Sequence, residues 1–72
     1  MEELKVGRVY EHFKGDKYIV EGTAYDSETL KEMVIYRSLY NEGKLWIREK
    51  ENFLGYKDDK KRFKLLDIKS KR

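Results

Sequence analysis

Apolar and polar residues alternate along several short stretches of the chain, and turn-forming residues separate these stretches. The pattern is typical of half-buried β-strands and covers residues 6–13 (VGRVYEHF), 18–25 (YIVEGTAY), 33–40 (MVIYRSLY), 45–49 (LWIRE) and 62–68 (RFKLLDI). Residues 26–32 (DSETLKE) alone carry helix signals, because Asp26 or Ser27 can cap the amides of Thr29 and Leu30. The pattern predicts an all-β fold, a five-stranded SH3-like half-open barrel with one short helical turn.

Residues 33–49 are predicted to form a β-hairpin around Asn41-Glu42-Gly43. We expect a three-residue turn with Gly43 at positive φ, because a two-residue turn would force Glu42 into that unfavourable conformation. This turn pairs Leu39 with Leu45. One face of the hairpin then carries Ile35, Arg37, Leu39, Leu45 and Ile47, and the other carries Tyr36, Ser38, Tyr40, Trp46 and Arg48.

Arg37 therefore shares a face with aliphatic residues, and three explanations are open. Its guanidinium extends past the rim of the sheet or forms a structural ion pair with Glu21, Glu28 or Glu32. Alternatively, it holds a phosphate or carboxylate of a ligand through two parallel hydrogen bonds. The third explanation is that the strand pairs in a different register from the one assumed here.

The composition fits one small folded domain, which we assign to residues 1–68, followed by a basic tail at residues 69–72. The chain has 72 residues, 43% of them charged, and 14% aromatic residues that can pack a core. The net charge of +3 is uneven, because residues 33–72 hold twelve basic and six acidic side chains. Such a basic end either holds phosphates by counterion release or is a solvated terminus.

Several classes of function lack support in the sequence. Cysteine is absent, which excludes disulfides and thiol chemistry, and no segment has the apolar length of a signal peptide or membrane span. His12 is the only histidine, and no catalytic triad context, carboxylate metal cluster or glycine-rich phosphate loop accompanies it. We therefore expect a cytoplasmic bacterial or phage protein that is not an enzyme and binds no metal, cofactor or membrane.

Aromatic and basic residues alternate along the predicted hairpin, and this is the strongest functional signal. Aromatic rings on a small sheet stack on bases, while arginine and lysine neutralise phosphates. The sequence predicts a binding module for a phosphate-bearing ligand, a nucleotide or nucleic acid. The candidate ligand-binding residues are His12, Lys14, Glu28, Tyr36, Arg37, Trp46 and Arg48. The alternative is that the same face binds a protein partner or a second copy of the chain.

Four segments, YEHFKGDKYIV, AYDSETLKEMVIYRSLY, LWIREKENF and RFKLL, resemble the small bacterial family called domain of unknown function 1653. The resemblance extends from about Gly7 to Leu66. It matches the family pattern at His12, Lys14, Gly15, Ser27, Glu28, Thr29, Tyr36, Arg37, Trp46, Arg48 and Phe53. Asp26 replaces the family's histidine before Ser-Glu-Thr, and Glu49 replaces its proline after Trp-x-Arg. The missing imidazole argues against catalysis, and the family name implies no activity.

Overall fold

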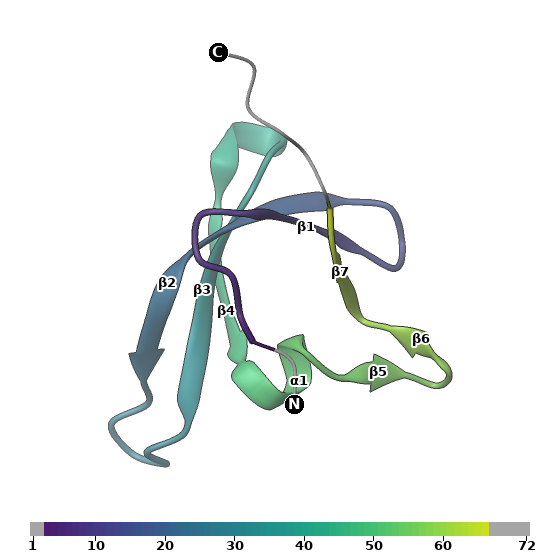
Figure 1. The fold of residues 1–72 in the computed structure, drawn as a ribbon. Coiled ribbons are helices and arrows are strands. Elements are labelled where there is room, and N and C mark those ends of the chain that lie inside the picture. Colours follow the sequence, from purple (N-terminus) through teal and green to yellow (C-terminus); the bar gives the residue numbers. More distant parts are fainter. Residues whose placement is uncertain (1–2, 67–72) are drawn as a thin grey trace.

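The computed structural model describes residues 3–66, which form a curved antiparallel sheet with one short helix and a small hairpin (Figure 1). The basic tail predicted at residues 69–72 lies outside the described residues. The elements are β1 (Val9–His12), β2 (Lys17–Tyr25), β3 (Glu32–Ser38), η1 (Asn41–Gly43), β4 (Leu45–Glu49), α1 (Lys50–Phe53), β5 (Tyr56–Lys57), β6 (Lys60–Lys61) and β7 (Phe63–Leu65).

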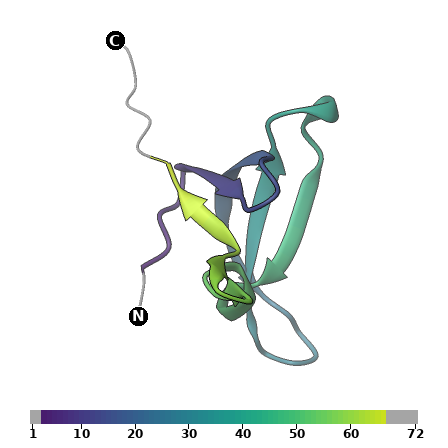
Figure 2. The ribbon, with the colours of Figure 1, turned by 90° about the vertical axis from the view of Figure 1, so that its right-hand side faces the viewer.

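The five main strands follow the order β4-β3-β2-β1-β7, and β5 and β6 form a separate two-stranded sheet. The five main strands lie where the alternating pattern placed them, so the predicted small all-β fold is confirmed, whereas the β5–β6 hairpin was not predicted. The sheet does not close into a barrel, because β4 and β7 are its two ends. Figure 2 shows how the sheet bends, with β7 (yellow) on one side and β3 and β4 (teal and green) on the other.

The inner face of the sheet packs an aromatic core. Along β3 the buried side chains are Val34, Tyr36 and Ser38, which alternate with the less buried Met33, Ile35 and Arg37. The core cluster consists of Tyr10, Val20, Val34, Tyr36, Phe53 and Phe63. Phe53 from α1 stacks on Phe63 from β7 with ring centroids 4.0 Å apart and an interplanar angle of 8°. The helix α1 therefore contributes its buried side chain, Phe53, to the core next to β7.

The one short helical turn lies elsewhere than predicted. Asp26 Oδ1 accepts hydrogen bonds from the amides of Glu28 at 2.8 Å and Thr29 at 3.2 Å, so the expected capping is present. Leu30, however, has a φ of 64°, and the chain turns directly from β2 into β3 instead of continuing as a helix. The observed helix is α1, where burial of Phe53 in the core supplies stabilisation that local propensity does not.

The β3–β4 hairpin has the predicted faces but a different register. Arg37 pairs with Leu45, whereas the three-residue turn would have paired Leu39 with that residue. The loop is therefore longer, and φ is positive at Asn41, Glu42 and Gly43. The expected positive φ of Gly43, at 62°, is confirmed. The assumed turn was wrong because Asn41 and Glu42 also enter the left-handed region, which the longer loop permits.

Candidate ligand-binding surface

Arg48 on β4 places its guanidinium over the aromatic core on the inner face. Its Cζ lies 5.3 Å from the centroid of the Phe63 ring. Arg48 Nε donates to the Tyr36 hydroxyl at 3.3 Å, and Nη1 donates to Asn52 Oδ1 at 2.6 Å. Among residues 3–66 no carboxylate forms an ion pair with Arg48, so these neutral partners orient its charge without neutralising it.

His12 at the end of β1 lies in a positive electrostatic environment beside Arg48. Its ring packs edge-on against Phe63 at 4.9 Å. Burial lowers its pKa below the ordinary value of 6.5, the charges of Arg48, Lys14 and Arg62 lower it further, and Asp16 opposes them only weakly. Nδ1 accepts the backbone N–H of Lys14 at 3.1 Å. The neutral ring therefore carries its proton on Nε2, which can donate to an acceptor.

Arg62, between β6 and β7, is the third cation that acts on His12. Its Nη2 donates to the Tyr56 carbonyl oxygen at 3.4 Å. Its Nε is buried and has no hydrogen-bond partner within the described part of the chain, which is uncommon for a buried donor. We call Lys14, Arg48 and Arg62 the cationic cluster. No carboxylate in residues 3–66 forms an ion pair with any of the three.

Partly exposed aromatic side chains lie toward the β3–β4 loop, and Trp46 among them is two residues before Arg48 on β4. The Tyr18 and Tyr40 hydroxyls lie 2.9 Å apart, and burial together with this hydrogen bond raises the pKa of Tyr18 to about 12. Tyr40 is 38% exposed and Trp46 is 48% exposed. Both rings border a hollow of about 370 Å³ whose lining also includes Ser38, Asn41, Glu42 and Lys44. A planar ligand group can stack on these rings.

Arg37 lies on the outer face of the sheet, opposite this surface. Its Nε forms an ion pair with Glu21 Oε2 at 2.8 Å, and its Nη1 donates to the Gly43 carbonyl oxygen at 2.9 Å. The structural ion pair with Glu21, one of the three explanations for Arg37, is therefore confirmed. The structure does not group Arg37 with Trp46 and Arg48. Tyr36 pairs with Trp46 and shares its face, and Arg37, the next residue of β3, points to the opposite face.

Glu28, another predicted ligand-binding residue, lies in the turn between β2 and β3, where its backbone amide is bound by Asp26. Its side chain is exposed, and no hydrogen bond to Arg37 is present. The structure thus brings His12, Tyr36, Trp46 and Arg48 to the inner face and leaves Glu28 outside the group. Lys14 lies in the turn after β1, where its charge acts on His12. Tyr36 is only 4% exposed and acts there through its hydroxyl on Arg48.

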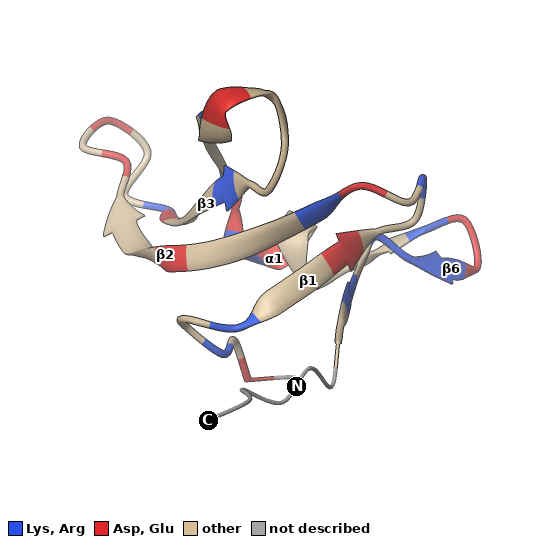
Figure 3. Cartoon of the chain, turned by 90° about the horizontal axis from the view of Figure 1, so that it is seen from above, with Lys and Arg blue, Asp and Glu red and all other residues tan. Residues whose placement is uncertain are grey.

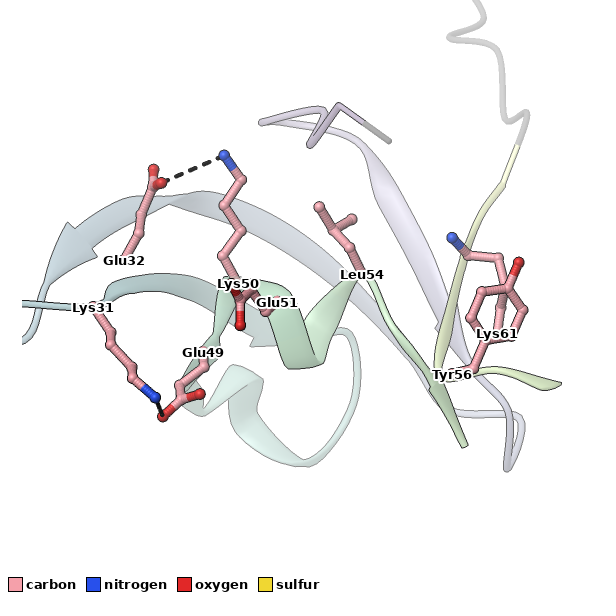
Figure 4. Close-up of a pocket in the computed structure, with 8 residues that line it drawn as sticks. All are labelled: Lys31, Glu32, Glu49, Lys50, Glu51, Leu54, Tyr56 and Lys61. Carbon is pink, nitrogen blue, oxygen red and sulfur yellow. Dashed lines mark hydrogen bonds and ion pairs between the residues drawn. The ribbon is translucent and has the colours of Figure 1, made fainter. Parts of the chain in front are cut away.

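A second hollow, of about 710 Å³, lies beside α1 and has a different charge arrangement (Figure 4). Its lining residues are Lys31, Glu32, Glu49, Lys50, Glu51, Leu54, Tyr56 and Lys61. Lys31 pairs with Glu49 at 3.7 Å, and Lys50 pairs with Glu32 at 3.4 Å. Lys31, Glu32, Glu49 and Lys50 are thus compensated within the fold, and none of the predicted ligand-binding residues lines this hollow.

Residues 3–66 contain no group of three or more histidine, cysteine, aspartate or glutamate side chains that could hold a metal ion. No helix in this part of the chain has the length and apolar character needed to cross a membrane.

The sequence did not identify Arg62 or Tyr18 as parts of the surface. Arg62 reaches His12 because β7 pairs with β1, with Phe63 opposite His12, and this contact joins distant parts of the chain. Tyr18 reaches Tyr40 because β2 pairs with β3. The alternation within β2 and within RFKLL marks these segments as strands, but nothing local indicates which strands become neighbours.

Comparisons with known proteins identify a family but no activity. The profile of the family described as "Protein of unknown function (DUF1653)" matches residues 8–65. A crystal structure of a DUF1653 protein from Bordetella bronchiseptica is similar, with 27% sequence identity and a TM-score of 0.79, over 100% of this chain and 99% of the other. No curated protein matches the chain. The matched length and the shared fold show that the chain belongs to the DUF1653 family.

Proposed function

We propose that this chain is a non-catalytic binding module that recognises a phosphate-bearing ligand, a nucleotide or nucleic acid, on the inner face. The observation that carries the proposal is the cationic cluster around a neutral His12, since no carboxylate in residues 3–66 pairs with its members. Uncompensated cations beside a partly buried ring favour an anionic partner. Trp46 lies two residues before Arg48 on β4, hence on the same face, and its half-exposed ring can stack on a planar base.

The donors on this surface fit the oxygens of a phosphate. Arg48 uses Nε and Nη1 for Tyr36 and Asn52, and no hydrogen bond within the described chain involves its Nη2. The Nε2–H of His12 is a further donor near the same charge. Because Tyr36 and Asn52 hold the guanidinium in place, binding costs little side-chain entropy.

Two substitutions test the proposal by isothermal titration calorimetry with a panel of nucleotides and short oligonucleotides at low salt. Arg48→Lys is expected to weaken binding about tenfold, because an ammonium cannot reproduce the guanidinium fork. Trp46→Ala is expected to cost about 1 to 3 kcal/mol of binding free energy through loss of stacking. Arg37→Lys is the matched control, since it is the same change on the neighbouring strand and the opposite face.

Salt dependence supplies a second test. Phosphate binding releases counterions and weakens steeply as ionic strength rises.

Unchanged affinity among the folded molecules of both Arg48→Lys and Trp46→Ala would reject the phosphate site, as would an equal loss in Arg37→Lys. Urea unfolding of each variant gives the folded fraction that this comparison requires.

The β4 edge favours a second candidate function, self-association or binding of a protein partner. β4 ends the sheet, and three of its side chains are exposed, Leu45 at 54%, Trp46 at 48% and Ile47 at 65%. An exposed apolar edge strand is a template for pairing with another strand. Sedimentation velocity distinguishes this function, because an apolar dimer persists at high salt and Ile47→Lys dissociates it. A monomer at all concentrations and salts would exclude self-association.

A further inference from the structure

The β5–β6 hairpin stands beside the turn between β1 and β2 and carries many basic residues. Both residues of β6, Lys60 and Lys61, are lysines, and the strand is drawn in blue next to an acidic turn in Figure 3. Two backbone hydrogen bonds of Arg62 hold the hairpin in place. The Arg62 amide donates to the Gly55 carbonyl oxygen at 3.0 Å, and the Arg62 carbonyl oxygen accepts the amide of Phe13 at 3.0 Å.

A cleft of about 540 Å³ lies between this hairpin and the β1–β2 turn. Its lining consists of Glu11, His12, Phe13, Gly15, Tyr56, Asp59, Lys60, Lys61 and Lys64. One of the two acidic residues, Glu11, forms an ion pair with Lys17 at 3.7 Å. The lining has three lysines, Lys60, Lys61 and Lys64, and two acidic residues. Tyr56, which is 62% exposed, adds an aromatic surface.

The cleft adjoins the cationic cluster at His12. His12 lines the cleft, and its ring packs against Phe63, whose ring lies under the Arg48 guanidinium. Arg62 joins the two regions, because its charge acts on His12 while its Nη2 contacts the Tyr56 carbonyl oxygen. A track of cations thus extends from Arg48 to the hairpin lysines, with an exposed aromatic ring near each end, Trp46 and Tyr56.

We infer that the ligand is single-stranded nucleic acid, with the chain of phosphates along this track. The inference rests on the proposed function and adds Tyr56 and Lys60 to the binding surface. A mononucleotide has too few phosphates to use both the cluster and the cleft. Duplex bases are paired and stacked inside the helix, so they cannot reach Trp46 and Tyr56, whereas unpaired bases stack on aromatic rings regardless of sequence.

Titration calorimetry at low salt tests the inference with three probes: thymidine 5′-monophosphate, a single-stranded eight-nucleotide oligothymidylate, and a duplex of eight base pairs. We expect the single strand to bind at least about tenfold more tightly than the mononucleotide, because it adds a second stacked base and further phosphates. The duplex is expected to bind more weakly than the single strand.

Variants of the β5–β6 hairpin test whether the oligothymidylate binds along it. Tyr56→Ala is expected to weaken the oligothymidylate at least about fivefold, and Lys60→Gln to weaken it severalfold, while neither changes mononucleotide binding. Lys57→Gln is the matched control, because Lys57 is exposed on the same hairpin and does not line the cleft. Both exposed lysines can be replaced without disturbing the core.

The outcomes separate this inference from the function on which it rests. Equal affinity for the mononucleotide and the oligothymidylate, preference for the duplex, or an equal loss in Lys57→Gln would overturn the single-strand inference. In each case, mononucleotide binding that is weakened by Arg48→Lys would still support the phosphate site. Absence of binding by all three probes would reject both proposals.

Discussion

Arg37 and Arg48 lie on neighbouring strands of one hairpin and show opposite uses of the same side chain. Arg37 meets a carboxylate, Glu21, on the outer face, and its charge is compensated within the fold. Arg48 meets a hydroxyl and an amide, Tyr36 and Asn52, which fix its position and leave the charge uncompensated. The difference teaches that the charge of the partner, more than the residue type or the local motif, decides whether an arginine is available to a ligand.

The largest expected effect is a difference in the free energy of unfolding between substitutions on the inner and the outer face. Phe63→Ala removes a buried ring that stacks on Phe53 and underlies Arg48, so we expect a loss of about 3 to 5 kcal/mol in the free energy of unfolding. Ile47→Ala on the outer face, where Ile47 is 65% exposed, is expected to cost less than about 1 kcal/mol. Urea unfolding measures both, and similar losses would contradict the assignment of the core to the inner face.

The next largest loss of stability is expected at Gly43, in the loop that holds Arg37 on the outer face. Its carbonyl oxygen accepts a hydrogen bond from Arg37, and its φ of 62° disfavours a β-branched residue. Gly43→Val is expected to destabilise the protein by more than about 1 kcal/mol. Gly22→Val is the control, since Gly22 has no positive φ and its Cβ position is open. A loss in Gly43→Val no larger than in this control would show that the loop conformation is different.

A smaller effect is expected for the Arg37–Glu21 pair itself. Both side chains are half exposed, at 44% and 41%, so solvent screens their attraction. A double-mutant cycle with Arg37→Ala and Glu21→Ala should give a coupling energy below about 1 kcal/mol that decreases with added salt. A coupling of more than about 2 kcal/mol, independent of salt, would mean that the pair is effectively buried.

The smallest effect concerns His12, whose pKa reports the charge of Arg48. The folded pKa lies below 6.5, so the unfolded chain binds more protons, and stability falls as the pH decreases from 6.5 toward the folded value. Arg48→Met removes a positive charge and should raise the folded pKa of His12. Arg37→Met should leave it unchanged. NMR titration of the single histidine measures each pKa, and equal shifts in the two variants would contradict the separation of the faces.

The alternating pattern was sufficient to predict the five main strands and the two faces of the β3–β4 hairpin, because period-two alternation is a local property. It did not predict β5 and β6, which have only two residues each, too few to show alternation. It could not predict that β7 pairs with β1, so the contacts of Arg62 and Phe63 with His12 were missed. The helix was misplaced for a related reason. Asp26 provides a local capping signal without a helix, whereas α1 depends on tertiary burial of Phe53.

Trp46 is the chain's only tryptophan, and its half-exposed position on the inner face makes it an intrinsic fluorescent probe of the candidate ligand-binding surface. When the tyrosines are excited, they transfer energy to this single acceptor. Tyr36 is its direct cross-strand neighbour on β3. A base that stacks on the indole should quench its emission, whereas a partner strand on the β4 edge should shift the emission to shorter wavelength by excluding water. The unlabelled protein can therefore report which of the two events occurs.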